Sequence, residues 1–383
     1  MKRARIGITV ATGLLLFAAG AYAQGKGPSE PLKIAMTANH WTPNGSAEFV
    51  QHKGFESLAL KNGAWAVLND LVFGSGTIEF DVETTEEMGT GIAFRVRGKD
   101  TLEYVYLRPS PKCPEDGKCM QYTPITHGVM LWDLFPRYQA SAPLKEGEWN
   151  HVKLVVSGQR MNVFINGART PTLKIGRLEG DASEGGIWLI GPGFFANLTV
   201  AADVVGELPS EPEQDATASD PRYLRSWQLS PYSTLSAGKE PAIEDLPAPT
   251  AAWQPLAAER SGLVNISRVY GYPIPSFGPD RALVWLKTTI KSDKSQTRKA
   301  DFGWVREAWV FVNGKLVYAD KNLFQPPTAR KAPDGRCSLE NGSILLPLNA
   351  GDNQVVVALA NNFYGWAVIV RLDSAEGIRL DGK

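Results

Sequence analysis

Three carboxylates alternate with apolar residues in the segment Glu79-Phe80-Asp81-Val82-Glu83. Successive side chains of a β-strand point to opposite faces, so Glu79, Asp81 and Glu83 are expected to share one face. Carboxylates that converge on a sugar ring are the groups that hydrolyse glycosidic bonds, which makes these three the candidate catalytic residues. Arg95 and Arg97, on the next predicted strand, allow a second interpretation in which cross-strand ion pairs account for the charges.

A second group of candidates combines aromatic rings, guanidinium groups and amides. Along 104–108, Val105 and Leu107 are predicted to face the core. Along 92–97, Ile92, Phe94 and Val96 are predicted to face the core as well. The opposite face, with its neighbours, supplies the candidate ligand-binding residues Arg95, Arg97, Tyr104, Tyr106, Arg108, Gln121, Tyr122 and Trp132. Flat aromatic rings stack on the CH faces of sugars while fixed donors meet the hydroxyls, so this face predicts sugar binding. The alternative is a solvated sheet face whose side chains pack on one another.

The loop 361–366 in the second half of the chain is rich in amide and aromatic groups. Loops at one end of a β-sandwich commonly carry the ligand, which adds Tyr364 and Trp366 to the ligand-binding candidates. The alternative is that Phe363 and Trp366 cap the core of their domain.

Cys113 and Cys119 flank a short loop that contains the turn pair Asp116-Gly117. We expect a disulfide between them, since two cysteines without a nearby histidine or further cysteine lack the spacing of a zinc site. Cys337 is then left over as a free thiol.

No linear motif of a cofactor or metal enzyme is present in the sequence. The histidines are dispersed, and there is no Gly-x-Ser-x-Gly elbow, phosphate loop or metal-binding histidine pair. We therefore predict no cofactor and no metal site, although structural calcium held by loop aspartates and carbonyls stays open.

The N-terminus has the three-part layout of a cleaved signal peptide over residues 1–23. Lys2, Arg3 and Arg5 precede an apolar stretch, and Ala21-Tyr22-Ala23 places small residues before Gln24. The apolar stretch is short for a spanning helix of about 20 residues, so no membrane anchor is expected after cleavage. The prediction is a periplasmic or extracellular protein.

Basic and acidic residues balance at 40 each over the 383 residues. Removing the leader leaves a mildly acidic chain, which argues against nucleic acid as a partner. The remaining length of about 360 residues suits two domains.

Period-two alternation between Gly and Pro turns predicts an all-β fold of two antiparallel β-sandwich (jelly-roll) domains. The first is expected over 24–203 and the second over 226–383. Residues 204–225, which are rich in Glu, Pro, Ser, Asp, Ala and Thr, have the composition of a linker.

The first half resembles the concanavalin A-like lectin/glucanase (laminin-G-like) domains of bacterial secreted proteins. The runs that carry the resemblance are GTIEFDV (76–82), GIAFR (91–95), YVYLRP (104–109), QYTP (121–124), EWNHVKLVV (148–156) and VFING (163–167). By similarity to the catalytic strand of laminarinase-type glucanases, Glu79 would be the nucleophile, Asp81 an intermediary and Glu83 the acid/base.

The second half resembles a galactose-binding-like sandwich in the runs WVFVNGK (309–315), LPLNAGDN (346–353) and Gly365-Trp366. Both resemblances imply a glycan or polysaccharide as partner, although a fold alone does not define an activity. We therefore expect an exported carbohydrate-binding or accessory glycan-recognition protein. The rivals are a glycoside hydrolase that acts through the concave face of the first domain and a non-enzymatic protein-interaction module.

Overall fold

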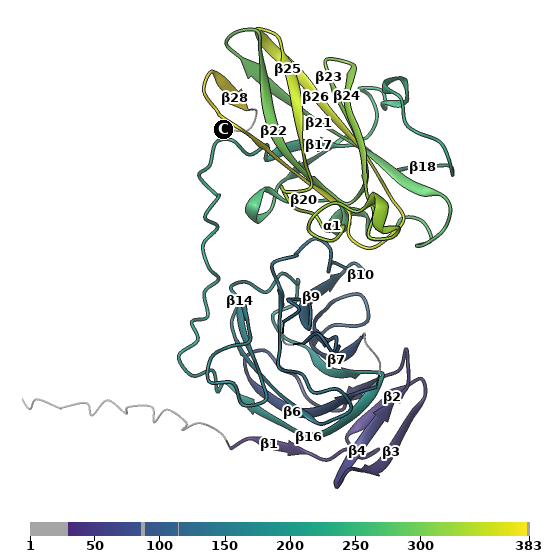
Figure 1. Cartoon of the computed structure of the whole chain (residues 1–383), viewed down its shortest axis with the longest axis vertical. Coiled ribbons are helices and arrows are strands. Elements are labelled where there is room, and N and C mark those ends of the chain that lie inside the picture. Colours follow the sequence, from purple (N-terminus) through teal and green to yellow (C-terminus); the bar gives the residue numbers. More distant parts are fainter. Residues whose placement is uncertain (1–29, 86–88, 114, 381–383) are drawn as a thin grey trace, which may run out of the picture.

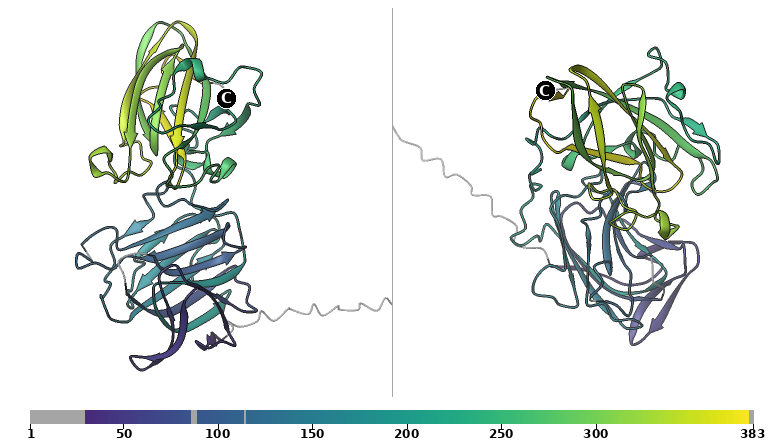
Figure 2. Two further views of the ribbon diagram at one scale, coloured as in Figure 1. Left: turned by 90° about the vertical axis from the view of Figure 1, so that its right-hand side faces the viewer. Right: turned by 45° about the horizontal axis from the view of Figure 1, so that its top comes forward.

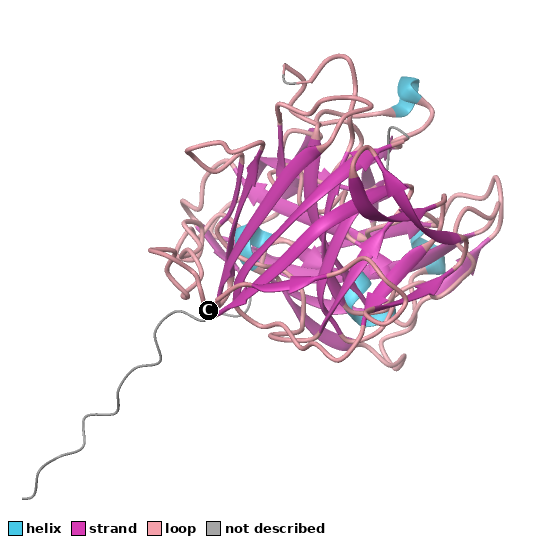
Figure 3. Ribbon diagram, turned by 90° about the horizontal axis from the view of Figure 1, so that it is seen from below, coloured by secondary structure: helices cyan, strands magenta, loops and turns pink. Residues whose placement is uncertain are grey.

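The computed structural model describes residues 30–85, 89–113 and 115–380, so the predicted signal peptide lies outside the described residues. Strands dominate the fold (Figure 3), and the predicted all-β class is confirmed. The helical segments of the described residues are short: η1 (Ile243–Asp245), η2 (Arg260–Gly262), α1 (Ser267–Tyr270) and η3 (Pro327–Ala329). None of the described helices has the length and apolar character needed to cross a membrane.

Two antiparallel sheets form the first sandwich, and all their strands lie between residues 32 and 202. One sheet has the order β14 (Leu173–Ile175), β13 (Arg160–Ile165), β12 (Asn150–Ser157), β6 (Gly76–Thr84), β16 (Gly193–Ala202), β4 (Phe55–Leu60) and β3 (Ala47–His52), and β1 (Leu32–Ile34) pairs with β16. The other has the order β10 (Val129–Met130), β9 (Met120–Thr126), β8 (Leu102–Leu107), β7 (Thr90–Val96), β15 (Gly186–Ile190), β5 (Trp65–Leu68) and β2 (Trp41–Asn44), and β11 (Gln139–Ala140) pairs with β9.

The alternation of β6 shows why these segments form sheets with one buried face. Ile78, Phe80 and Val82 are fully buried between the two sheets, whereas the carboxylates between them point outward. Each such side chain contributes about 1.5–3 kcal/mol when it leaves water, so a one-residue shift in register would be heavily penalised. The register therefore places all the β6 carboxylates on the outer face.

The second sandwich is built from strands between residues 226 and 380. Its larger sheet has the order β19 (Gln254–Ala257), β17 (Ser226–Leu229), β21 (Arg281–Ser292), β26 (Gly351–Asn361), β23 (Arg306–Val312) and β24 (Lys315–Asn322), and both β18 (Ser233–Leu235) and β28 (Ile378–Leu380) pair with β21. Its smaller sheet has the order β20 (Val264–Asn265), β27 (Ala367–Leu372), β22 (Gln296–Trp304) and β25 (Gly342–Leu348). A separate apolar core fills the space between these sheets.

The two sandwiches are stacked end to end, with residues 203–225 running along one side (Figures 1 and 2). The β9 and β10 strands lie next to the second sandwich, and β6 and β16 lie on the side turned away from it. Val305, Cys337 and Ile369 of the second sandwich join the apolar cluster of the first. The contact between the sandwiches is therefore partly a hydrophobic core rather than a meeting of two polar surfaces.

Candidate functional site

Three of the predicted ligand-binding side chains form one hydrogen-bonded network next to the second sandwich, where β8 ends and β9 begins. The Tyr106 hydroxyl donates to Gln121 Oε1 at 2.9 Å, and Arg108 Nη2 donates to the Tyr106 oxygen at 2.8 Å. Arg108 also bonds to Gln121 Oε1, and its guanidinium carbon lies 4.8 Å from the centre of the Tyr106 ring. The arginine is thus held in place by partners that leave part of it exposed.

Trp132 joins this network to the second sandwich. Gln121 Nε2 donates to the Trp132 carbonyl at 2.8 Å. The indole meets Phe324 and Tyr364 edge-on, with ring centres 4.9 and 5.6 Å away, and the Arg336 guanidinium lies 4.9 Å from its centre. We call the set Tyr106, Arg108, Gln121, Trp132, Phe324, Arg336, Phe363 and Tyr364 the Trp132 cluster.

The backbone next to Trp132 locks the two sandwiches together. Both carboxylate oxygens of Asp133 accept the Gly365 N–H, at 3.0 and 3.2 Å, and the Asp133 carbonyl accepts the Cys337 N–H at 2.8 Å. Burial raises the pKa of Asp133 to about 7. A side chain at position 365 would collide with Asp133 and Leu134, so only glycine allows this approach.

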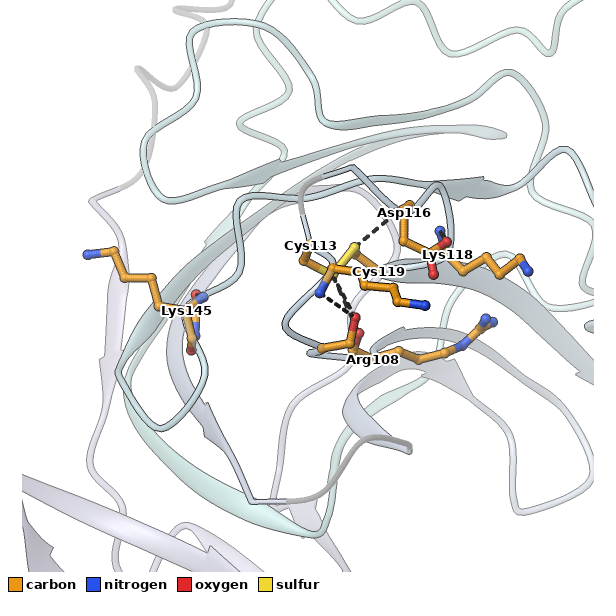
Figure 4. Close-up of a disulfide and its surroundings, with 9 residues drawn as sticks. Arg108, Cys113, Asp116, Lys118, Cys119 and Lys145 are labelled. Atoms are coloured by element: carbon orange, nitrogen blue, oxygen red, sulfur yellow. Dashed lines mark hydrogen bonds between the residues drawn. A yellow bond between two sulfur atoms is a disulfide. The ribbon is translucent and has the colours of Figure 1, made fainter.

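The predicted disulfide between Cys113 and Cys119 is confirmed, and it stands directly beside the network (Figure 4). The Arg108 N–H donates to the Cys119 carbonyl at 2.7 Å, so the bridge closes the connection that carries Arg108 into β9. From the same loop, Lys118 forms an ion pair with Asp334 of the second sandwich. The bridge therefore restrains both the network and a contact between the sandwiches.

Cys337 is a free, buried thiol. Burial raises its pKa, which keeps the thiol protonated and unreactive at neutral pH. Nothing in its surroundings gives it a chemical role.

The prediction of an open stacking platform is wrong, because its aromatic side chains are buried. Tyr104, Tyr106 and Trp132 are only 5%, 6% and 7% exposed, because the rings pack on one another and under loops. Tyr104 stacks on Tyr106 with ring centres 5.1 Å apart, and its hydroxyl donates to the Gly89 carbonyl at 2.5 Å. The alternative, in which tyrosines and arginines of this face pack together, describes most of it.

The exposed aromatic surface beside the cluster comes from residues that the sequence analysis missed. Phe277 is 64% exposed, and its ring centre lies 5.2 Å from that of Phe363 and 5.7 Å from that of Tyr364. An aromatic residue within the turn-rich run 271–280 was the available signal for Phe277. Phe324 and Arg336 carried no such signal, since only the stacking of the sandwiches brings them to Trp132.

Two predicted ligand residues are core residues instead. Tyr122 is fully buried, where its hydroxyl donates to Glu103 Oε2 at 2.6 Å and accepts the Glu179 N–H at 2.6 Å. Trp366 is 1% exposed inside the second sandwich, as the alternative interpretation of its loop expected. Neither side chain can meet a ligand from outside.

Arg95 and Arg97 do not reach the Trp132 cluster. Arg95 has a φ of 52° at a break in the β7–β15 register, which turns its guanidinium to the carbonyls of Gly74 and Gly158. Arg97 is exposed and pairs with Glu184 at 3.2 Å. The break also moves Val96 to the face opposite the one predicted, among the outward-facing aromatic side chains of this sheet.

The candidate catalytic carboxylates lie on the outer face of β6 and are paired there. Glu79 meets Lys153 at 3.0 Å and His151 Nε2 at 3.2 Å, and Asp81 meets His151 Nδ1 at 2.8 Å. A cavity of about 360 Å³ is lined by Glu79, His151, Lys153 and Phe164. This histidine–carboxylate group of the outer face therefore borders a cavity.

Glu83 is separated from that group by its own partners. It is 7% exposed and bonds to His52 at 3.0 Å and to Lys53 at 2.8 Å. The expected ion pairs of the β6 carboxylates with Arg95 and Arg97 are wrong, because β7 belongs to the opposite sheet. Histidine and lysine from β12, from the end of β3 and from the turn that follows it take their place.

Among residues 30–85, 89–113 and 115–380, no group of three or more histidine, cysteine, aspartate or glutamate side chains could hold a metal ion. The Trp132 cluster offers hydrogen bonds, two guanidinium cations and aromatic surface. The chemistry that these groups suit is recognition of a polar, ring-shaped ligand.

A family model described as a 3-keto-alpha-glucoside-1,2-lyase-like domain matches residues 35–200. This match supports, in general form, the expected likeness of the first sandwich to domains that act on or bind carbohydrate. The galactose-binding-like interpretation of residues 226–383 remains a prediction. No curated protein matches the chain.

Solved structures resemble the fold only distantly. The carbohydrate-binding module CBM66 of Bacillus subtilis is 13% identical, with 42% of this chain and 91% of that chain covered and a TM-score of 0.28. Domain 4 of an extracellular arabinanase from Geobacillus stearothermophilus is 12% identical, with 44% and 85% covered and a TM-score of 0.30. A galectin of Caenorhabditis elegans is 9% identical, with 44% and 99% covered and a TM-score of 0.28. Likenesses at this level carry no functional argument.

Proposed function

We propose that this protein is exported and recognises a glycan through the Trp132 cluster. The observation that carries the proposal is the fixed network of Arg108, Tyr106 and Gln121, which stands beside Trp132 and Tyr364. Preorganised donors next to aromatic rings suit the hydroxyls and CH faces of a sugar. The family match of residues 35–200 supports a carbohydrate ligand.

The partly buried state of the cluster favours a ligand that contacts its rim. Arg108 and Tyr364 are half-buried and Phe277 is exposed, so a sugar can meet these groups while Trp132 supports them from below. Groups with a fixed orientation lose little conformational entropy on binding. Arg108 and Tyr364 are thus the residues that we assign to direct contact.

The test is a glycan array on the mature protein, followed by titration of the best glycan against two matched variants. Arg108→Gln should weaken binding roughly tenfold, because a hydrogen bond from a charged donor contributes about 1.5 kcal/mol. Arg97→Gln, which removes an exposed arginine that pairs with Glu184, should leave the affinity unchanged. Absence of glycan binding, or equal effects of the two variants, would overturn the proposal.

Export is tested separately. Cleavage between Ala23 and Gln24 should give a mature chain that begins at Gln24, which intact-mass analysis of the exported protein measures. Retention of residues 1–23 in that protein would contradict the assignment.

A second candidate function is cleavage of a 3-keto-glucoside, which the description of the matching family favours. In a 1,2-elimination of this kind the C2–H bond, next to the ketone, and the C1–O bond break, a C1=C2 double bond forms, and the aglycone oxygen leaves and takes up a proton. His151, whose Nδ1 and Nε2 lie 2.8 Å from Asp81 and 3.2 Å from Glu79 beside a cavity, is the residue that we assign to proton transfer in this second function. Release of the aglycone from a 3-keto-α-glucoside by the wild type, and its loss in His151→Asn, would favour this function over recognition alone.

A further inference from the structure

Two cavities lie between the sandwiches, under the segment 203–225. They have volumes of about 400 and 510 Å³, and Arg260 lines both. Their walls come from the first sandwich (Arg137), from the connecting segment (Asp215 and Thr217) and from the second sandwich (Ser261). We call these two cavities the Arg260 crevice. It shares no residue with the Trp132 cluster, and each volume lies in the range of small-molecule sites.

Most charges around the crevice compensate one another. Arg268 bridges the sandwiches by contacting Asp181 and Glu259 at 2.5 Å each. Arg137 pairs with Glu179 at 2.7 Å. These pairs hold the walls together and leave little net charge for a ligand to meet.

Arg260 differs from these arginines. In the described part of the chain no carboxylate lies within ion-pair distance of its guanidinium, whose Nη2 donates to the Gln214 carbonyl at 3.1 Å. Its Nε is buried without a hydrogen-bond partner, as is the Nε of Arg225, which lines the larger cavity. The Nε of Arg177, in the same wall, lies 3.7 Å from Glu179 Oε2. Unpaired buried donors are costly, so two of them around one space favour a bound species that completes their bonding.

The backbone next to Arg260 is also unusual. Ser261 has a φ of 56°, a conformation that a residue with a side chain rarely adopts. Its N–H donates to Asp215 Oδ2 at 3.2 Å, which ties the strained turn to the connecting segment. Strain of this kind is retained where surrounding contacts hold it, often at ligand sites.

We propose that the Arg260 crevice binds a sugar acid, with the ligand carboxylate on the Arg260 guanidinium. The planar fork of an arginine matches a carboxylate with two parallel hydrogen bonds. Ser261 offers a hydroxyl, and Asp215 and Glu259 offer acceptors for sugar hydroxyls. Those two carboxylates disfavour a multiply charged phosphate, so a singly charged acid with several hydroxyls fits the wall best.

The test measures binding of galacturonate to the mature protein by calorimetry, with galactose as the neutral match and propionate as a singly charged carboxylate without a sugar ring. Galacturonate should bind at least about tenfold more tightly than either. Equal binding of galactose would contradict the role assigned to Arg260, equal binding of propionate would show that the sugar ring is not recognised, and no binding of galacturonate would overturn the whole proposal.

Two arginine variants locate the site. Arg260→Gln should lower galacturonate affinity at least about tenfold. Arg298→Gln is the matched control, because Arg298 also has an unpartnered Nε and donates to a backbone carbonyl, that of Glu376, but lies outside the crevice. Equal effects of the two variants would contradict the assignment.

A measurement without any variant guards against misfolding as the explanation. Gln214 and Thr217 border the crevice, so saturating galacturonate should slow proteolytic cleavage between residues 205 and 225 severalfold, and galactose should not. An unchanged cleavage rate would count against the site. The proposal is independent of the glycan site, since Arg260→Gln should retain glycan binding and Arg108→Gln should retain galacturonate binding.

Discussion

The outer face of β6 and the Trp132 cluster both arise from polar residues that alternate with apolar ones along a strand. On β6, each carboxylate finds its partners in its own sheet or in an adjacent turn: Lys153 and His151 for Glu79, and His52 and Lys53 for Glu83. In the Trp132 cluster, the side chains of β8 and β9 are joined through Trp132 to residues that lie about 200 positions later in the chain. The outer face is therefore a local arrangement, whereas the cluster depends on how the two sandwiches stack.

The largest effect is expected from Trp132→Ala, which removes a contact between the two sandwiches on which the cluster depends. The indole is 7% exposed and packs against Phe324, Tyr364 and Arg336, so its loss should cost about 3–5 kcal/mol of unfolding free energy. Urea denaturation provides the measurement. Trp188→Ala is the control within the first sandwich, where Trp188 is half-buried and stacks on Trp65. A cost of Trp132→Ala no greater than that of Trp188→Ala would show that the second sandwich does not depend on this contact.

The pH dependence of stability should be large and should come from buried carboxyls. Burial raises the folded-state pKa of Asp133, and that of Glu103, to about 7, above their ordinary values of 3.8 and 4.5. At these two positions the folded protein therefore binds more protons than the unfolded chain between about pH 4 and 7. The contribution of the two groups to stability is greatest below about pH 4 and is lost as the pH rises through 7. The loss should be on the order of 3 kcal/mol per group.

Asp133→Asn isolates the contribution that the Asp133 carboxyl, at the contact between the sandwiches, makes to the pH dependence of stability. The amide oxygen can still accept the Gly365 N–H without carrying a charge, so this variant should lose part of the pH dependence. Glu103→Gln should remove the share that belongs to the interior of the first sandwich. Urea denaturation at pH 5 and pH 8 measures both, and an unchanged slope in Asp133→Asn would show that its carboxyl is not strained at neutral pH.

A smaller effect is expected when the disulfide is removed by the double change Cys113→Ser and Cys119→Ser. Closing so short a loop contributes about 2 kcal/mol or less to stability. The bridge restrains Arg108 and the Lys118–Asp334 ion pair, so glycan affinity should fall severalfold while the first sandwich stays folded. Calorimetry with the glycan found on the array is the measurement. Unchanged glycan affinity would show that the disulfide does not support the Trp132 cluster.

The smallest effects are expected on the outer face of β6. Glu79→Gln should cost less than about 0.5 kcal/mol, because its partners are exposed. Glu83→Gln should cost about 1 kcal/mol, because the Glu83 carboxylate is itself buried. Neither should alter glycan affinity. A loss of turnover on a 3-keto-α-glucoside in Glu79→Gln alone would move the outer face from a structural to a catalytic role.

Local pattern was sufficient for the features that depend on neighbouring residues. Alternation predicted the all-β class and the outward direction of Glu79, Asp81 and Tyr106, since a strand's geometry imposes a period of two. The short loop between Cys113 and Cys119 predicted their bridge, because so few intervening residues keep the two cysteines close together. The alternation fails at Arg95, because its positive φ reverses the faces to which the side chains at the end of the strand point.

Only the tertiary structure decided which of the candidate residues meet. Tyr122 has the same aromatic character as Tyr106, yet a buried Glu103 and a backbone N–H hold its hydroxyl in the core. Trp132 and Tyr364 come together because Asp133 can approach Gly365, a contact between residues 232 positions apart. Contacts at such separations depend on the packing of whole sandwiches, and strand periodicity carries no information about that packing.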